Sequence, residues 1–76
     1  MRDLPEQFGL VLRRLRLEQR WSQEMLAHRA EINRSYLGEI ERGTAVPSLA
    51  TMAKLADALD IHLSTLLARC ERQLGP

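Results

Sequence analysis

The sequence predicts an all-α fold, and three observations support this. Of the 76 residues, 45% are hydrophobic but only 4% are aromatic, which is typical of a small core built from aliphatic helices. Apolar residues recur at three- and four-residue steps along most of the chain, the period of an amphipathic helix. No stretch shows the alternation of a half-buried strand. We expect a single helical domain over residues 1–76, near the size at which dimerisation often adds stability.

The stretch from residue 21 to residue 43 predicts two short helices joined by a tight turn. Ser22 and Asn33 are good N-caps, because their side-chain oxygens can accept hydrogen bonds from a first helical turn. Gly43 follows the second helical pattern, where a left-handed C-cap is favoured. We therefore expect a helix-turn-helix over about residues 22–42.

Three further helical patterns surround this motif. Pro5 fits the first turn of a helix that ends near Gln19, and Gly9 inside that helix indicates close packing. Ser48 is the expected N-cap of a fourth helix. Its apolar positions are Leu49, Met52, Leu55, Ala56 and Leu59. After a break, a fifth helix is expected over about residues 63–72.

Charge and cysteine content narrow the function only slightly. Eleven Lys and Arg against ten Asp and Glu give a net charge of +1, which is weak support for nucleic-acid binding by bulk charge. The one cysteine, Cys70, cannot form an internal disulfide or a metal cluster. The chain has no long apolar run, and its N-terminus does not resemble a signal peptide, so we expect a cytoplasmic protein.

Catalysis finds little support in the sequence. His28 and His62 are isolated, and Cys70 in an apolar stripe is better explained as a small hydrophobic residue than as a nucleophile. No nucleophile–base motif, phosphate loop or metal-ligand spacing occurs. We expect no enzyme activity, no cofactor and no small-molecule ligand.

The outer side of the second helix of the motif is polar. It carries Asn33, Arg34, Ser35, Gly38 and Glu39. A helix that reads DNA in the major groove needs hydrogen-bonding side chains near its N-terminus. A solvated face on a packed helix would look the same, so this pattern by itself leaves both interpretations open.

The order of residues resembles a known family. The matching positions are Arg16, Ser22-Gln23, Leu26-Ala27, Ile40-Glu41-Arg42-Gly43, Pro47-Ser48-Leu49 and Leu55-Ala56. Together they are similar to the helix-turn-helix domain of lambdoid phage repressors, Cro-like proteins and bacterial regulators of the xenobiotic-response-element type. The run Arg34-Ser35-Tyr36 before Ile40-Glu41-Arg42-Gly43 also resembles the small controller proteins of restriction–modification systems.

The resemblance implies a five-helix, lambda-repressor-like DNA-binding domain whose third helix reads the bases. The base-reading residues it implies are Asn33, Arg34, Ser35 and Glu39. The residues it implies for phosphate contact are Gln23, Tyr36, Arg42 and Thr44, although Tyr36 is more simply explained as cover for the core edge. Arg16 and Glu41 match a structural ion pair. Many relatives carry glycine where this chain has Glu31, so a left-handed backbone there would strain the glutamate.

The resemblance also implies a homodimer that acts on a pseudo-palindromic DNA operator. We expect the dimer interface on the fifth helix, at Leu63, Leu66, Leu67, Cys70 and Leu74, because part of this apolar stripe would stay exposed on a monomer. Two alternatives remain open. One is an antitoxin that represses its own operon, and the other is a protein-interaction module that keeps the fold without binding DNA.

Overall fold

The protein is an assembly of five helices, seen here in a computed structural model that describes residues 3–74. The helices are α1 (Leu4–Glu18), α2 (Gln23–Ala30), α3 (Arg34–Arg42), α4 (Leu49–Ala58) and α5 (Leu63–Leu74). The all-α prediction is confirmed, and each predicted helix lies within a few residues of its observed bounds. None of the helices in this described part is long and apolar enough to cross a membrane.

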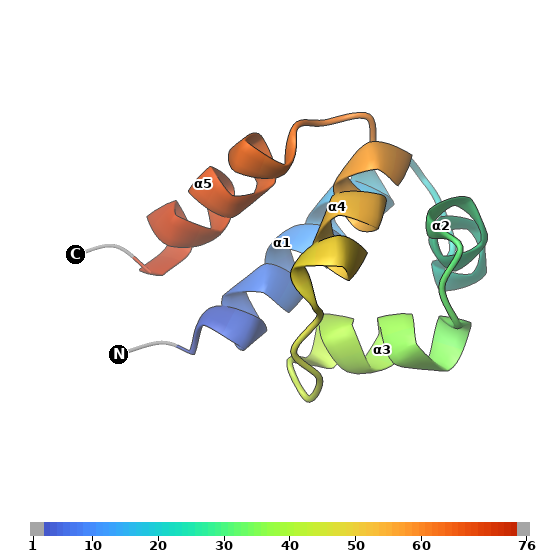
Figure 1. Ribbon diagram of the computed structural model, residues 1–76, viewed down its shortest axis with the longest axis horizontal. Helices are drawn as coiled ribbons and strands as arrows, with labels where there is room; N and C mark the ends of the chain where they lie inside the picture. Colours follow the sequence, from blue (N-terminus) through green and yellow to red (C-terminus); the bar gives the residue numbers. More distant parts are fainter. Residues whose placement is uncertain (1–2, 75–76) are drawn as a thin grey trace.

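Helix α1 lies at the centre of the arrangement. Helices α3 and α5 pack on opposite sides of α1, and α2 contacts both α3 and α4 (Figure 1). Helix α4 also contacts α5, which closes the fold around one core. Because α3 lies at the edge of this arrangement, one of its sides faces solvent.

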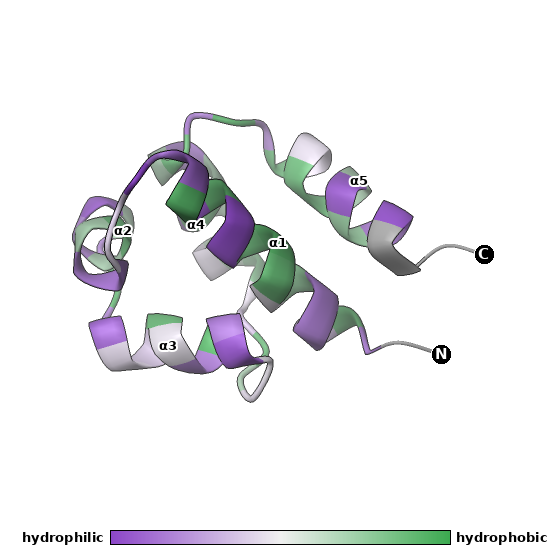
Figure 2. Cartoon of the chain, turned by 180° about the vertical axis from the view of Figure 1, so that it is seen from behind, coloured by the Kyte–Doolittle hydropathy of each residue, from purple (hydrophilic) through white to green (hydrophobic). Residues whose placement is uncertain are grey.

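The core is made of aliphatic side chains from all five helices. Hydrophilic residues occupy the outer faces of the helices, while hydrophobic ones gather where the helices meet (Figure 2). The largest fully buried side chains are Leu12, Leu26, Leu37, Ile40, Leu55, Leu66 and Cys70. Trp21 and Ile32, which precede the caps of α2 and α3, are half-buried against this core.

Helices α1 and α3 cross very closely at Gly9. A β-carbon at this position would lie 2.6 Å from the backbone oxygen of Glu41, well inside van der Waals contact. Only glycine therefore allows the backbones to approach this far. The close packing expected at Gly9 is confirmed, and it fixes where α3 sits on α1.

The predicted N-caps are present. The Ser22 hydroxyl accepts a hydrogen bond from the Met25 N–H at 3.1 Å, and the Ser48 hydroxyl accepts one from the Thr51 N–H at 3.1 Å. The side-chain oxygen of Asn33, Oδ1, accepts hydrogen bonds from the backbone N–H groups of Ser35 and Tyr36 at 2.7 and 3.4 Å. These caps set the first residues of α2, α3 and α4.

Helices α2 and α3 end on residues in the left-handed backbone region. Gly43 ends α3 with φ of 79°, as expected for a glycine C-cap. Glu31 ends α2 with φ of 57°, so the turn between α2 and α3 does place a side chain in the region that favours glycine. Such a residue costs about 1–2 kcal/mol relative to right-handed backbone. The turn thus adopts the left-handed conformation at Glu31 although glutamate disfavours it.

The apolar pattern of α4 begins outside the core. Leu49 is 65% exposed rather than buried. It is the first residue of α4, directly after the Ser48 cap, and the buried side of that helix is formed about two turns later by Leu55 and Ala56. The periodicity of apolar residues predicts which side of a helix is buried, but not at which turn the burial begins.

Candidate nucleic-acid interface

The outer side of α3 is exposed and polar. Asn33, Arg34, Ser35 and Glu39 are all exposed, and none of them is held in the core. The hydrophobic residues of the same helix, Leu37 and Ile40, are fully buried on its other side. Helix α3 is therefore amphipathic, with its polar side free for a ligand.

A buried ion pair anchors α3 to α1. The Arg16 guanidinium donates to both carboxylate oxygens of Glu41, at 2.7 and 2.9 Å, and it also donates to the backbone oxygen of Trp21 at 2.8 Å. Arg16 and Glu41 are only 7% and 8% exposed. A bidentate pair of this kind is geometrically specific, so it fixes the orientation of α3.

The contact with Glu41 favours the charged form of Arg16. Hydrogen bonding to Glu41 raises the pKa of Arg16 above its ordinary value, although burial acts in the opposite direction. A folded-state pKa above the ordinary value means that the stabilisation is complete below that ordinary value. As the pH rises, this contribution of Arg16 is lost only in strongly alkaline solution, far above neutral pH.

Hydrogen bonds continue from this ion pair to the polar side of α3. The side-chain amide of Gln23 donates to Glu41 Oε1 at 3.0 Å. The Gln23 carbonyl oxygen in turn accepts from Arg34 Nη1 at 3.2 Å. We call the resulting chain Arg16–Glu41–Gln23–Arg34 the polar chain. It leads from the buried α1–α3 contact to an exposed guanidinium at the start of α3.

Gly38 makes room for this polar chain. A β-carbon at Gly38 would lie 3.2 Å from Arg42 Nη1 and 3.8 Å from Gln23 Oε1. The Arg42 and Gln23 side chains thus approach the same point on α3. Three of the side chains implied for DNA contact, those of Gln23, Arg34 and Arg42, are consequently brought together.

The other residues implied for phosphate contact lie apart from this cluster. The Thr44 hydroxyl is exposed and donates to the backbone oxygen of Glu39 at 3.1 Å, which orders the start of the loop after α3. Tyr36 is half-buried and packs against the core. Its position agrees with the interpretation that it covers the core edge.

The burial of the α5 residues differs from what the expected dimer interface requires. Leu66 and Cys70 are 0% exposed, so neither side chain can contact a partner, and their assignment to a dimer interface is wrong. Both point into the core because α5 packs on α1 and α4. Burial also raises the pKa of the Cys70 thiol. Leu63 and Leu67 are half-buried, and the side chain of Leu74 lies outside the described residues.

The structure adds an apolar surface that sequence periodicity did not find. Leu67 of α5 lies in a shallow hollow of about 130 Å³ with Leu4, Pro5, Phe8, Val46, Pro47 and Met52. Of these lining residues, Val46 is 74% exposed and Leu4 is 48% exposed. We call this surface the apolar flank of α5. The signal missed in the sequence is Val46, an isolated hydrophobic residue in a polar loop.

Among residues 3–74, no group of three or more His, Cys, Asp or Glu side chains is placed to hold a metal ion.

Comparison with known families gives one clear match. The family model described as helix-turn-helix matches residues 12–66, which include all of α2, α3 and α4. The match covers the polar chain and the exposed side of α3.

Two control proteins are similar over most of their length. The control protein C.MunI of a Mycoplasma species is 35% identical over 74 residues, which span 96% of this chain and 100% of that protein. The crystal structure of the restriction–modification controller protein C.AhdI from Aeromonas hydrophila superposes with a TM-score of 0.79. It is 45% identical, and the match covers 82% of this chain and 94% of that one.

Longer regulators are also similar. The HTH-type transcriptional regulator SutR of Escherichia coli is 32% identical over 68 residues, which are 90% of this chain but 38% of that protein. The chain thus spans about two fifths of the length of SutR, and likewise 41% of the immunity repressor protein of Bacillus phage phi105.

Proposed function

This chain belongs to the helix-turn-helix family of DNA-binding transcriptional regulators, which are not enzymes, and from that premise we propose that it binds a pseudo-palindromic operator as a homodimer. Since its operator is genomic DNA, the protein acts in the cytoplasm. The observation that carries the proposal is the polar chain, because it holds an exposed arginine at the N-terminus of α3 by hydrogen bonds from a buried ion pair.

Arg34 is the principal base reader in this proposal. Its guanidinium carries five N–H donors, and only one hydrogen bond, to Gln23, holds it among the described residues. It can therefore present two donors to guanine O6 and N7, the commonest specific contact in the major groove. The hydrogen bond to Gln23 limits the rotamers of Arg34 before DNA arrives, which lowers the entropy lost on binding.

The remaining residues of the face have narrower roles. Glu39 is a carboxylate acceptor one helical turn further along and suits cytosine N4. The Asn33 oxygen is occupied by capping, so Asn33 contacts DNA through its amide N–H groups. Ser35 can donate to or accept from a base edge or phosphate.

Phosphate contacts flank the reading residues. Gln23 starts α2, and its second amide N–H is free alongside the backbone N–H groups of that helix end. Arg42 and Thr44 lie at the other end of α3, and Tyr36 adds a hydroxyl at the core edge. Contacts at both ends of α3 would fix its register in the groove without adding sequence preference.

We propose that the apolar flank of α5 is the dimer interface. Val46 and Leu4 are the exposed large hydrophobics of this flank, and Leu67 joins them to α5. Exposed apolar residues that gather around a hollow are typical of an association surface. The flank begins in the loop that directly follows α3. A dimer formed there must place its two reading helices at neighbouring turns of DNA, about 34 Å apart.

Sedimentation analysis tests this interface. Val46→Asp changes an exposed loop residue, so we expect folded protein with a dimer dissociation constant about tenfold weaker or more. Thr65→Asp on the outer side of α5 is the matched control and should leave the constant unchanged. A parent protein that stays monomeric through micromolar concentration would contradict the interface.

We also propose that the chain is a restriction–modification controller. Its support is the similarity to C.MunI and C.AhdI over almost the full length of both proteins.

Selection of bound duplexes from a random DNA pool, followed by sequencing, tests the proposed function. We expect enrichment of a two-fold symmetric motif, and that motif should occur upstream of the protein's own gene beside a restriction–modification pair. If no motif is enriched, the chain is an interaction module that keeps the fold, and the proposal fails.

A further inference from the structure

The flank of α5 opposite the apolar one is basic. A hollow of about 380 Å³ lies between α1 and α5, and we call it the arginine groove. It is lined by Val11, Arg14, Leu15, Glu18, Arg69 and Arg72. Its residues come from helices far apart in the sequence, so only the fold brings them together.

The arginine groove concentrates positive charge. Three guanidiniums and one carboxylate give it a local charge of +2, whereas the whole chain carries +1. The rest of the protein therefore carries a net charge of −1, so the groove holds more positive charge than the chain as a whole. Like charges placed together repel one another, so the arrangement favours a bound anion.

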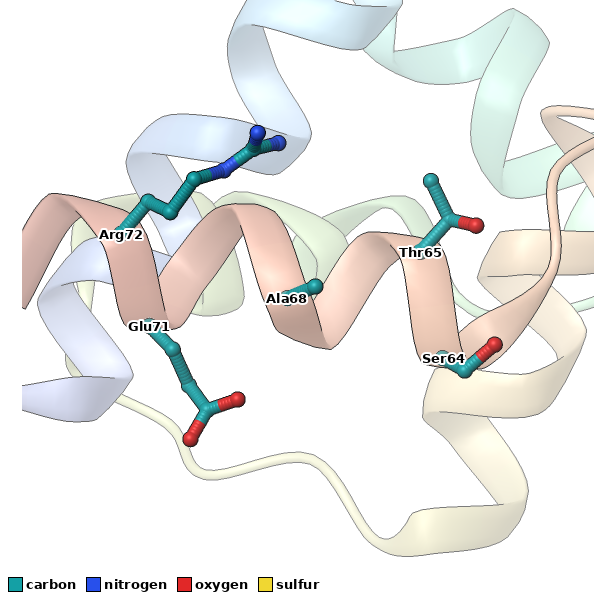
Figure 3. A pocket seen from close by; sticks show the side chains of 5 residues that line it. All are labelled: Ser64, Thr65, Ala68, Glu71 and Arg72. Carbon is teal, nitrogen blue, oxygen red and sulfur yellow. The ribbon is translucent and has the colours of Figure 1, made fainter.

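Among the residues whose side chains are described, the three arginines form no ion pair. Within residues 3–72, whose side chains are described, Arg16–Glu41 is the only ion pair. No side-chain hydrogen bond in that range is donated by Arg14, Arg69 or Arg72. Figure 3 shows Arg72 pointing from α5 toward α1, while Glu71 points to the opposite side of the helix. Glu71 therefore does not neutralise the groove.

The base of the groove is apolar. Val11 and Leu15 are 4% and 7% exposed and present aliphatic carbon between the charged side chains. A ligand that fits the groove thus combines carboxylates, which guanidiniums bind in a bidentate manner, with a hydrophobic group.

We propose that the arginine groove binds an acidic peptide segment of a partner protein, one that carries aspartate or glutamate beside an aliphatic residue. An inorganic anion would use the arginines but make no contact of its own with the aliphatic carbon of Val11 and Leu15. The operator is a poor fit, because α3 and α5 lie on opposite sides of α1 in both overall views (Figures 1 and 2). Glu18 would also repel a continuous phosphate backbone.

Fluorescence anisotropy with a labelled peptide of alternating glutamate and leucine tests the proposal. We expect the parent protein to bind this peptide, and the same peptide with glutamine in place of glutamate to bind at least about tenfold more weakly. The double variant Arg69→Gln, Arg72→Gln should lose about tenfold or more in affinity, because each charge-assisted hydrogen bond contributes strongly. Arg13→Gln, a neighbouring exposed arginine outside the groove, is the matched control and should bind like the parent.

Three results would overturn the proposal. Equal binding of both peptides, or of the parent and the double variant, would remove the site. Displacement of the peptide by an equal concentration of inorganic phosphate would make it a general anion site. Loss of dimer or operator affinity in the double variant would assign the groove to a second copy or to DNA. Because operator binding is measured separately, failure here leaves the proposed function standing.

Discussion

The two ends of the polar chain differ in burial and in the number of hydrogen bonds that hold them. Arg16 and Glu41 are buried, bidentate and held between α1 and α3, whereas Arg34 is exposed and held by a single hydrogen bond of 3.2 Å. The buried end stabilises the fold, and the exposed end keeps free donors for a ligand. Stability and recognition are therefore separable by substitution although one network contains both.

The largest expected effect comes from breaking the buried end. Glu41→Ala leaves the Arg16 guanidinium buried without its carboxylate, so we expect a loss of about 3–5 kcal/mol in the free energy of unfolding. Chemical denaturation followed by circular dichroism measures it. The control Glu39→Ala removes an exposed carboxylate of the same helix and should change stability by no more than about 0.5 kcal/mol. Similar losses in both variants would show that the ion pair does not stabilise the fold.

The next effect should appear only in binding. Arg34→Ala removes an exposed side chain, so the free energy of unfolding should stay within about 0.5 kcal/mol of the parent. Affinity for the selected operator should fall by about 1–3 kcal/mol, as for the loss of a bidentate base contact. Titration of labelled operator at constant salt measures the fall. Unchanged affinity would remove Arg34 as a reader.

The link between the two ends should have an intermediate effect on binding. Gln23→Ala breaks the two hydrogen bonds that Gln23 makes in the polar chain, to Glu41 and Arg34. We expect about 1 kcal/mol less affinity for operator because Arg34 is no longer oriented. A double-mutant cycle with Arg34→Ala separates orientation from direct phosphate contact. Additive losses would mean that Gln23 acts by itself rather than through Arg34.

The smallest effect should raise stability without changing recognition. Glu31→Gly relieves the left-handed residue between α2 and α3, where φ is 57°. We expect a gain of about 0.5–1 kcal/mol in the free energy of unfolding. Thermal unfolding measures this gain, and operator affinity should equal that of the parent. A loss of stability would show that the Glu31 side chain contributes contacts that offset the strain.

Local signals predicted the fold well. Ser22, Asn33 and Ser48 act as caps through hydrogen bonds to residues two or three positions away, so the sequence contains both partners. Gly43 likewise ends α3 through its own left-handed backbone conformation, which is a local feature. Such contacts do not depend on the rest of the molecule, and for this reason the helix bounds could be predicted closely.

Contacts between helices were predicted less well. The apolar stripe of α5 showed that one side of the helix is buried, but not how far α1 and α4 would cover it, so Leu66 and Cys70 were misassigned to the surface. The Arg16–Glu41 pair followed from family resemblance and not from periodicity. The arginine groove had no sequence signal, because Arg14 and Arg69 meet only after α1 and α5 pack.

The account rests most on Arg34 as the reader at the exposed end of the polar chain. We would select DNA from a random pool in parallel with the parent protein and with Arg34→Ala, and compare the two motifs base by base. We expect the variant to lose preference at one guanine position in each half-site while the other positions and the half-site spacing stay the same. Identical motifs from both proteins would contradict the account, since Arg34 would then read no base.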